Sequence, residues 1–276
     1  VKSCGKPLSK SLPRELLKGK ALNKLGISPV VSTAILTSVL MAVTIAAAMV
    51  SYDVLRGHMA ETEFKVVEDS YVELAKLMNR DVWVGNATHS VTFRCRFGGP
   101  MVVVTSDNLT VGIENPVEDF EPLNLTTITN ITWVGYKNRY TTVVERNLVG
   151  NRSLIVNGDV VVSVYTGHLG ETLIRLDGLR VGVVNAGNIS LNGENWNYVV
   201  LRVVKLTRGL TAGVEVFTVR WTTTNVSALT VLINKSISNL TVVAYHTFFG
   251  QYGQILGRVE KKTIQLNPGA KGTVIT

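Results

Sequence analysis

A run of 26 uncharged residues, from Ile27 to Tyr52, constrains this chain more than any other feature. Val, Ala, Ile, Leu and Met dominate the run, and a helix of about 20 such residues is enough to cross the hydrocarbon core of a bilayer. Seven basic residues and one acidic residue precede it, so the charge bias places the N-terminus in the cytoplasm. The chain beyond residue 53 is then expected outside the cytoplasmic membrane.

The formal net charge of +8 comes mainly from this basic leader, which carries +6 within residues 1–26. Beyond Gly26 the chain has 21 basic and 19 acidic residues and is nearly neutral. No stripe of Arg and Lys with interleaved aromatic residues indicates a nucleic-acid-binding face, so no nucleic-acid partner is expected.

Three interpretations of the apolar run remain open. In a secretory signal peptide, residues 46–48 (Ala-Ala-Ala) would form the cleavage site and Met49 would begin the mature protein. In a plain membrane anchor, the whole chain from Val1 would be retained. In the third, the run is kept and packs against copies of itself.

The residues after the run favour the third interpretation. Apolar residues recur there at alternating spacings of four and three, which predicts one buried helix face. No proline interrupts residues 30–80, so one helix is expected from about Val30 to Asn79, on the order of 75 Å long. A filament subunit needs both a helix apolar all round and a seam beyond it. The expected assembly residues are Val30, Ile35, Leu36, Val39, Leu40, Val43, Ala60, Phe64, Val67, Tyr71 and Leu74.

The start of this helix resembles the class III signal of archaeal type IV pilins and archaellins. The resemblance rests on Lys24-Leu25-Gly26 followed by Ile27-Ser28-Pro29-Val30-Val31 and covers about residues 18–55. It implies that a prepilin peptidase recognises the basic region with Lys24 and cuts after Gly26, which makes Ile27 the mature N-terminus. Val31 stands where bacterial type IV pilins usually carry glutamate.

The same resemblance implies the partners and the location of the protein. The chain would be inserted in the cytoplasmic membrane, processed by the peptidase, and passed to a pilus assembly platform. It would then polymerise with itself into an extracellular filament that contacts surfaces or other cells. The implied organisation is a leader in residues 1–26, a filament-core helix in residues 27–82 and an outer domain in residues 83–276.

After Trp83, short runs rich in Val, Ile and Thr alternate with Asn and Gly turns, which is typical of β-strands. The expected class is α+β, with the helix followed by an antiparallel, immunoglobulin-like β-sandwich. Asn157-Gly158 predicts a two-residue hairpin, and residues 114–123 and 185–197 are expected to be loops. Strands are expected at 91–97, 101–106, 126–134, 140–148, 153–156, 160–166, 171–176, 197–206, 213–223, 228–234, 240–249 and 257–266.

Sequons for N-glycosylation lie only beyond residue 85, on the side expected to be extracellular. Chance in a Thr- and Asn-rich β domain is the alternative explanation. The candidate sites are Asn86, Asn108, Asn124, Asn130, Asn151, Asn188, Asn225, Asn234 and Asn239.

No motif in the sequence indicates catalysis, a cofactor or a metal. The four histidines are scattered, none is part of H-E-x-x-H, and none is at a zinc-ligand spacing from Cys95. Neither a nucleophile elbow nor a phosphate-binding glycine loop is found. We therefore expect a structural protein rather than an enzyme: an adhesive pilus subunit first, a rotating archaellin second, and a membrane-anchored or secreted ligand-binding β-sandwich as the rival of another class.

Overall fold

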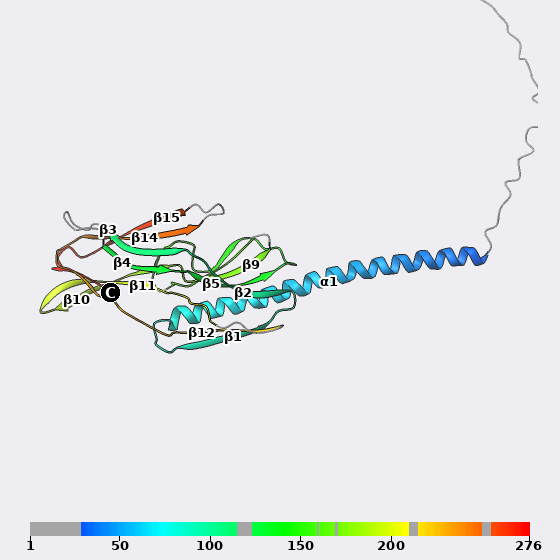
Figure 1. Ribbon diagram of the computed structural model, residues 1–276, viewed down its shortest axis with the longest axis horizontal. Coiled ribbons are helices and arrows are strands. Elements are labelled where there is room, and N and C mark those ends of the chain that lie inside the picture. Colours follow the sequence, from blue (N-terminus) through cyan, green and yellow to red (C-terminus); the bar gives the residue numbers. More distant parts are fainter. Residues whose placement is uncertain (1–28, 115–122, 159, 169–170, 210–214, 250–254) are drawn as a thin grey trace, which may run out of the picture. The chain divides into compact units, whose positions relative to one another are not determined.

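A computed structural model describes residues 29–114, 123–158, 160–168, 171–209, 215–249 and 255–276 (Figure 1). The chain divides into two units, Val1–Val54 and Leu55–Thr276, and each is described by itself. The described part of the first unit is helical. The second unit holds the rest of the same helix and every strand that the structure describes.

The helix α1 (Pro29–Asp81) is a single element of 53 residues. Pro29 occupies its first position, where the missing N–H is not needed and the fixed φ favours a helix. The helix ends in a turn in which the backbone N–H of Val82 donates to the carbonyl of Met78 at 2.9 Å. The expected helix, Val30 to Asn79, is confirmed to within two residues at each end.

The strands of the second unit form four sheets. Their orders are β1-β12, β13-β16-β11-β10-β7, β15-β14-β3-β4 and β2-β5-β9-β8-β6. All described pairings are antiparallel except β10 with β7 and β11 with β16, which are parallel. The bounds are β1 (Thr88–Arg94), β2 (Gly98–Val104), β3 (Asn108–Glu114), β4 (Leu123–Thr129), β5 (Thr132–Asn138), β6 (Arg146–Val149), β7 (Ile155–Asn157), β8 (Ser163–His168), β9 (Thr172–Asp177), β10 (Val181–Leu191), β11 (Glu194–Val203), β12 (Val216–Thr222), β13 (Val231–Ile233), β14 (Asn239–Phe249), β15 (Ile255–Gln265) and β16 (Gly272–Ile275).

The part of α1 in the second unit lies between the two-stranded β1–β12 ribbon and the sheet β2-β5-β9-β8-β6 (Figure 1). Both layers contribute to one hydrophobic cluster with the helix, which we call the helix core. Its buried members are Phe64, Val67, Tyr71, Leu74, Ala75 and Met78 of the helix, with Phe93, Cys95, Tyr136, Val161, Val162, Val164, Ile174, Leu176 and Val204.

A second hydrophobic cluster, the sheet core, joins the other two sheets. In β3 and β14, alternate side chains are buried, because successive residues of a strand point to opposite faces. The buried positions of these two strands include Leu109, Val111, Ile113, Leu240, Val242 and Ala244, which pack with Val181, Val183, Val199, Ile233 and Ile275 from the facing sheet. The α+β class and the antiparallel β-sandwich are thus confirmed.

Several details of the β region differ from the expectation. Strands β3, β10 and β16 were not predicted, and the expected strand at 126–134 is two strands. Asn130 separates them with a φ of 56°, a left-handed conformation that Asn tolerates better than most residues and that breaks a strand. The expected loop at 185–197 is largely a hairpin, formed by β10 and β11 around Asn192 and Gly193, whose φ values are 52° and 80°.

The hairpin expected at Asn157-Gly158 does not form. β7 ends at Asn157 and pairs with β10, whereas the next strand along the chain, β8, belongs to another sheet. Gly158 does have a positive φ of 83°, so a turn forms at this position. It connects strands of two different sheets rather than two paired strands. Of the other expected loop, residues 115–122 lie outside the described residues.

Candidate functional site: the apolar half of helix α1

The first half of α1, Pro29–Tyr52, is the most unusual surface in the described chain, and we call it the apolar half. Every residue from 29 to 55 is exposed. Its 24 residues correspond to about 36 Å of helix, and contiguous exposed apolar surface of this extent marks an interaction site. The assembly residues expected here are between 53% and 73% exposed: Val30, Ile35, Leu36, Val39, Leu40 and Val43.

Hydroxyl side chains interrupt the apolar half, and those of Thr33, Thr37, Ser38 and Thr44 are hydrogen-bonded within the helix. Thr33 donates to the carbonyl of Val30 at 3.0 Å, and Ser38 donates to that of Ile35 at 2.8 Å. The hydroxyls of Thr37 and Thr44 likewise bond carbonyls three and four residues earlier. These groups can therefore enter an apolar medium without leaving a donor unpaired.

By length and composition, α1 could cross a membrane, and none of its most apolar stretch is buried against the rest of the chain. A helix suits such a medium, because its backbone hydrogen bonds are all internal. The apolar half can accordingly be covered by lipid or by other helices.

The second half of the helix, Leu55–Asp81, is the docked half, and its apolar seam corrects one expectation. Ala60, Phe64, Val67, Tyr71 and Leu74 were predicted to belong to the assembly surface, but each is at most 3% exposed. Phe64, Val67, Tyr71 and Leu74 lie in the helix core with strands of their own chain, and the carbonyl of Ala60 accepts from the Asn138 amide at 3.5 Å. Side chains buried in this way have no surface left for a neighbouring copy, so their role is to fix the helix to its own β domain.

Polar contacts add to this attachment. The Glu63 carboxylate accepts hydrogen bonds from the backbone N–H groups of Arg96, at 2.6 Å, and Phe97, and from the hydroxyl of Tyr136. Arg96 and Phe97 form the connection between β1 and β2. One helix side chain therefore holds both the ribbon connection and a central strand of the facing sheet.

Two further side chains connect the docked half to the sheet β2-β5-β9-β8-β6. The carboxylate of Glu68, only 4% exposed, pairs with the guanidinium of Arg146 at 2.5 Å. The Asn79 amide both donates to the carbonyl of Val162 at 3.0 Å and accepts from its N–H at 2.8 Å. The sequence pattern did not point to these contacts, since Glu63, Glu68 and Asn79 look like ordinary solvent-facing helix residues.

The candidate glycosylation sites are all accessible in the structure. Eight of the nine sequon asparagines are exposed, and Asn108 is half-buried. By contrast, the fully buried asparagines Asn138 and Asn197 are not in sequons. Surface access thus permits modification at every candidate, while the processing residues Lys24, Gly26 and Ile27 lie outside the described residues.

The described residues offer little for catalysis or ligand binding. No group of three or more His, Cys, Asp or Glu side chains among them could hold a metal ion. Cys95 is buried, and burial together with the Glu63 carboxylate raises the pKa of its thiol to about 12, so the nucleophilic thiolate is disfavoured. His246 is half-buried beside Asp107, at 3.4 Å.

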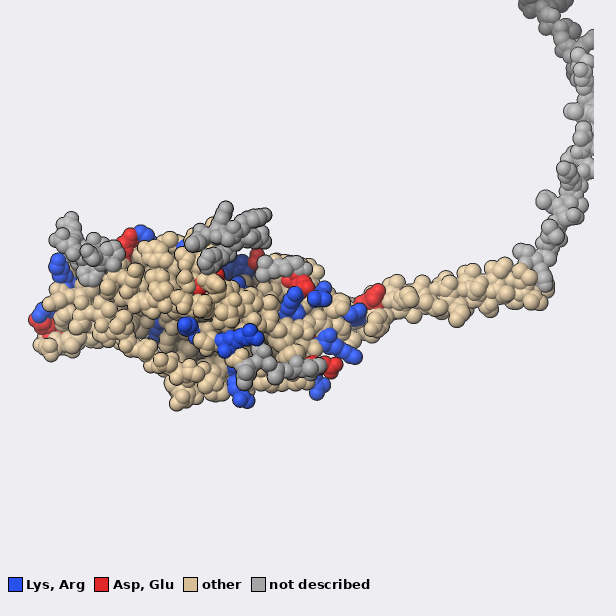
Figure 2. Space-filling model, in the orientation of Figure 1, with Lys and Arg blue, Asp and Glu red and all other residues tan. Residues whose placement is uncertain are grey.

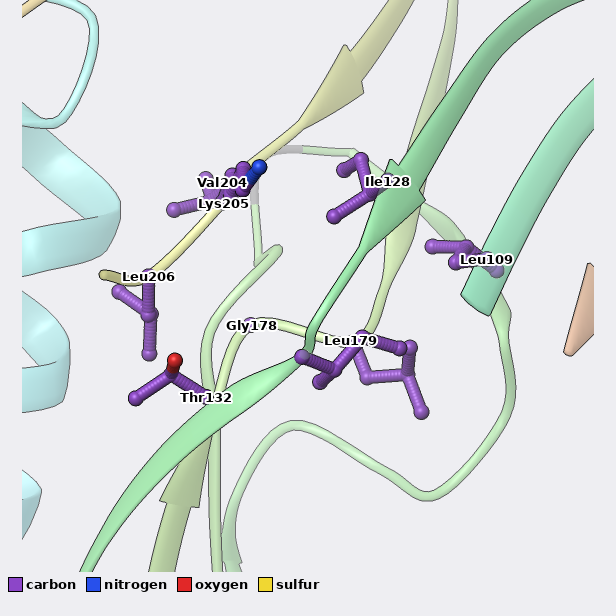
Figure 3. Close-up of a pocket in the computed structure, with 9 residues that line it drawn as sticks. Leu109, Ile128, Thr132, Gly178, Leu179, Val204, Lys205 and Leu206 are labelled. Atoms are coloured by element: carbon purple, nitrogen blue, oxygen red, sulfur yellow. The ribbon is translucent and has the colours of Figure 1, made fainter. Parts of the chain in front are cut away.

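A pocket between the helix core and the sheet core is also too small for an organic ligand (Figure 3). Leu109, Ile128, Leu179 and Leu206 give it mostly apolar walls. The space open to the centre of a water molecule is about 10 Å³, which is room for roughly one water.

Comparisons with protein families, with curated proteins and with solved structures found no match to this chain.

Proposed function

We propose that this chain is the structural subunit of an extracellular filament of the archaeal type IV pilus kind, with an adhesive role. The apolar half would form the filament core by bundling with the same segment of other copies, and the β domain would form the outer layer. One observation carries the proposal: the apolar half is exposed along its whole length, although the chain has a large domain that could have covered it.

The state of the docked half supports this division of roles. Its seam and the carboxylates of Glu63 and Glu68 already have partners within the chain, so this half needs no outside partner. The apolar half has no such partner within the described residues, and four of its hydroxyls are hydrogen-bonded to the helix itself. Its Ala, Ser and Thr residues also allow helices to approach closely. A membrane anchor explains why this half is apolar. A bundle of helices explains both its apolarity and its content of small residues.

Sequencing the N-terminus of the mature protein, isolated from the cells that produce it, tests the proposal directly. Ile27 is expected as the first residue, and negatively stained surface material should contain filaments with a helical core. Val1 at the N-terminus would indicate a retained anchor, and Met49 would indicate a secreted domain; either result overturns the proposal.

A processing variant sharpens this test. Gly26→Val should leave the leader attached and abolish filaments, because the implied cleavage follows Gly26. Gly19→Val, which changes another leader glycine, is the matched control and should still be processed. Equal processing of the two variants would contradict the implied cleavage site.

A further inference from the structure

A positively charged surface lies over the β1–β12 ribbon and the neighbouring segment 202–208. We call it the basic face, and its members are Arg94, Arg96, Arg202, Lys205, Arg208 and Arg220. Residues 83–97 and 202–222 together hold these six basic residues and one acidic residue, Glu215. The rest of the chain beyond Gly26 has fifteen basic and eighteen acidic residues. Figure 2 shows Lys and Arg side chains gathered over and around the ribbon.

The two segments are brought together by pairing and packing. In the ribbon, Ser90 pairs with Arg220 and Arg94 pairs with Val216. Val204 belongs to the helix core, and Leu206 packs against it together with the inward-facing ribbon residues Phe217, Val219 and Trp221. Most apolar residues of both segments therefore point inward, with Val84 and Val216 the exposed exceptions among their described large apolar side chains, and the basic residues are left at the surface.

Most of this charge is available to a partner. No ion pair forms between Arg94, Arg96, Lys205, Arg208 or Arg220 and a described acidic side chain, and all five residues are exposed. The guanidinium of Arg202 lies over the Trp83 ring at 5.2 Å. The Glu63 carboxylate, next to the face, is already occupied by backbone N–H groups.

The types of side chain exposed on the outer side of the ribbon indicate which class of polyanion the basic face would bind. Its remaining exposed positions are mainly hydroxyl residues, among them Thr88 with Thr222 and Thr92 with Thr218, whose oxygens lie 3.1 and 2.8 Å apart. Its aromatic residues Phe93, Phe217 and Trp221 face the helix core. Stacking of nucleic-acid bases needs exposed rings, and lipid insertion needs exposed apolar side chains. Guanidinium groups bind carboxylate and sulfate well, and hydroxyls suit the sugar hydroxyls between them.

We propose that the basic face binds acidic polysaccharides, through Arg and Lys to carboxylate or sulfate groups and through the ribbon hydroxyls to the sugar ring. This inference names the class of target for the adhesive role and rests on the proposed function for its meaning. Binding itself requires only the β domain, so it can be measured on full-length chain in detergent whether or not filaments form.

The test measures retention on immobilised heparin across about 50 to 200 mM salt, the range in which contacts to polyanions weaken steeply. The double variant Arg94→Gln/Arg220→Gln removes two charges from the ribbon. Lys235→Gln/Lys271→Gln removes two exposed charges from elsewhere and is the matched control. The ribbon variant is expected to bind heparin roughly three- to thirtyfold more weakly, and the control within about twofold of the unmodified chain.

Three results would overturn the inference. Equal weakening by both double variants would show a general charge effect rather than a site. Duplex DNA or anionic vesicles bound as tightly as heparin at the same salt would assign the face to another partner. Equal retention on uncharged dextran would show that the acidic groups of the polysaccharide are not recognised. A circular dichroism melt of each variant confirms that the fold is intact.

Discussion

The two halves of helix α1 are both rich in apolar residues, yet they lie in opposite surroundings. In the docked half the apolar residues form one stripe, which the ribbon and a sheet of the same chain cover. In the apolar half they occupy every side of the helix, and all of them are exposed. A stripe can be covered by one folded domain, because the other sides of the helix stay in water. A helix apolar all round needs lipid or several neighbours.

The most complete loss of the proposed function is expected from placing a charge in the apolar half. Leu40→Asp should abolish filaments and reduce membrane insertion, because an acidic residue at the centre of such a helix costs about 2.5–3.5 kcal/mol even on the most lenient scales. The melting temperature of the β domain should not change, since Leu40 belongs to neither hydrophobic core of that domain. Electron microscopy of surface material checks the loss of filaments, and a thermal melt checks that the β domain is unchanged.

Leu40→Ala is the matched control for this variant and should still assemble, because it keeps the helix apolar. Normal filaments from Leu40→Asp would contradict the proposed difference between the two halves, because the apolar half would then accept a charged side chain without loss of assembly.

In the docked half, truncation should instead unfold the domain. Tyr71→Ala is expected to lower the free energy of unfolding by about 3–5 kcal/mol, because it empties a site that is 1% exposed. Tyr71→Phe is the control and should be neutral or stabilising, because the buried Tyr71 hydroxyl has no hydrogen-bond partner. Urea titration measures both. If Tyr71→Phe lowered the free energy of unfolding as much as Tyr71→Ala, the hydroxyl rather than the packing of the ring would be the stabilising group, which contradicts this prediction.

A smaller effect is expected at the polar attachment. Glu63→Ala should cost about 1–3 kcal/mol of unfolding free energy, because the N–H groups of Arg96 and Phe97 lose their acceptor. Glu61→Ala, two residues away and exposed, should change it by less than about 0.5 kcal/mol. Hydrogen exchange should also quicken at residues 96 and 97 in the Glu63 variant. Unchanged exchange there would show that the carboxylate does not hold the connection.

The smallest effect concerns acid stability. Burial lowers the pKa of His246, and Arg175 and Arg258 act in the same direction, while the Asp107 carboxylate opposes them. The unfolded chain then binds a proton more readily than the folded one, so this group's stabilisation is present above the ordinary pKa of about 6.5 and is lost as pH falls below it. The urea midpoint of unfolding should decrease as the pH is lowered from 7.5 to 5.5. His246→Asn should make this dependence of the midpoint on pH weaker. An identical slope in the variant would exclude His246 as the cause.

The sequence predicted the helix well because its signal is local. Periodicity, an absence of proline and the first-turn Pro29 are readable without knowing any neighbour. The role of the seam was not readable, because residues such as Phe64 and Tyr71 show the same spacing whether a sheet of the same chain or another helix covers them.

The strands illustrate the same limit. Asn192-Gly193 and Asn157-Gly158 carry similar turn signals, yet one joins paired strands and the other connects different sheets. Which strands pair is decided by contacts far apart in the chain, such as β3 with β14. The basic face likewise combines two segments more than 100 residues apart, and neither segment is unusual alone.

The internal hydrogen bonds of Thr33, Thr37, Ser38 and Thr44 have a mechanical consequence for any bundle built from this helix. Because these four hydroxyls donate to carbonyls of their own helix, they offer a neighbouring helix no free donor that would fix its position along the helix axis. In a filament of the proposed kind, helices held together mainly by dispersion would slide along one another at modest cost, so the filament should stretch and bend before it breaks.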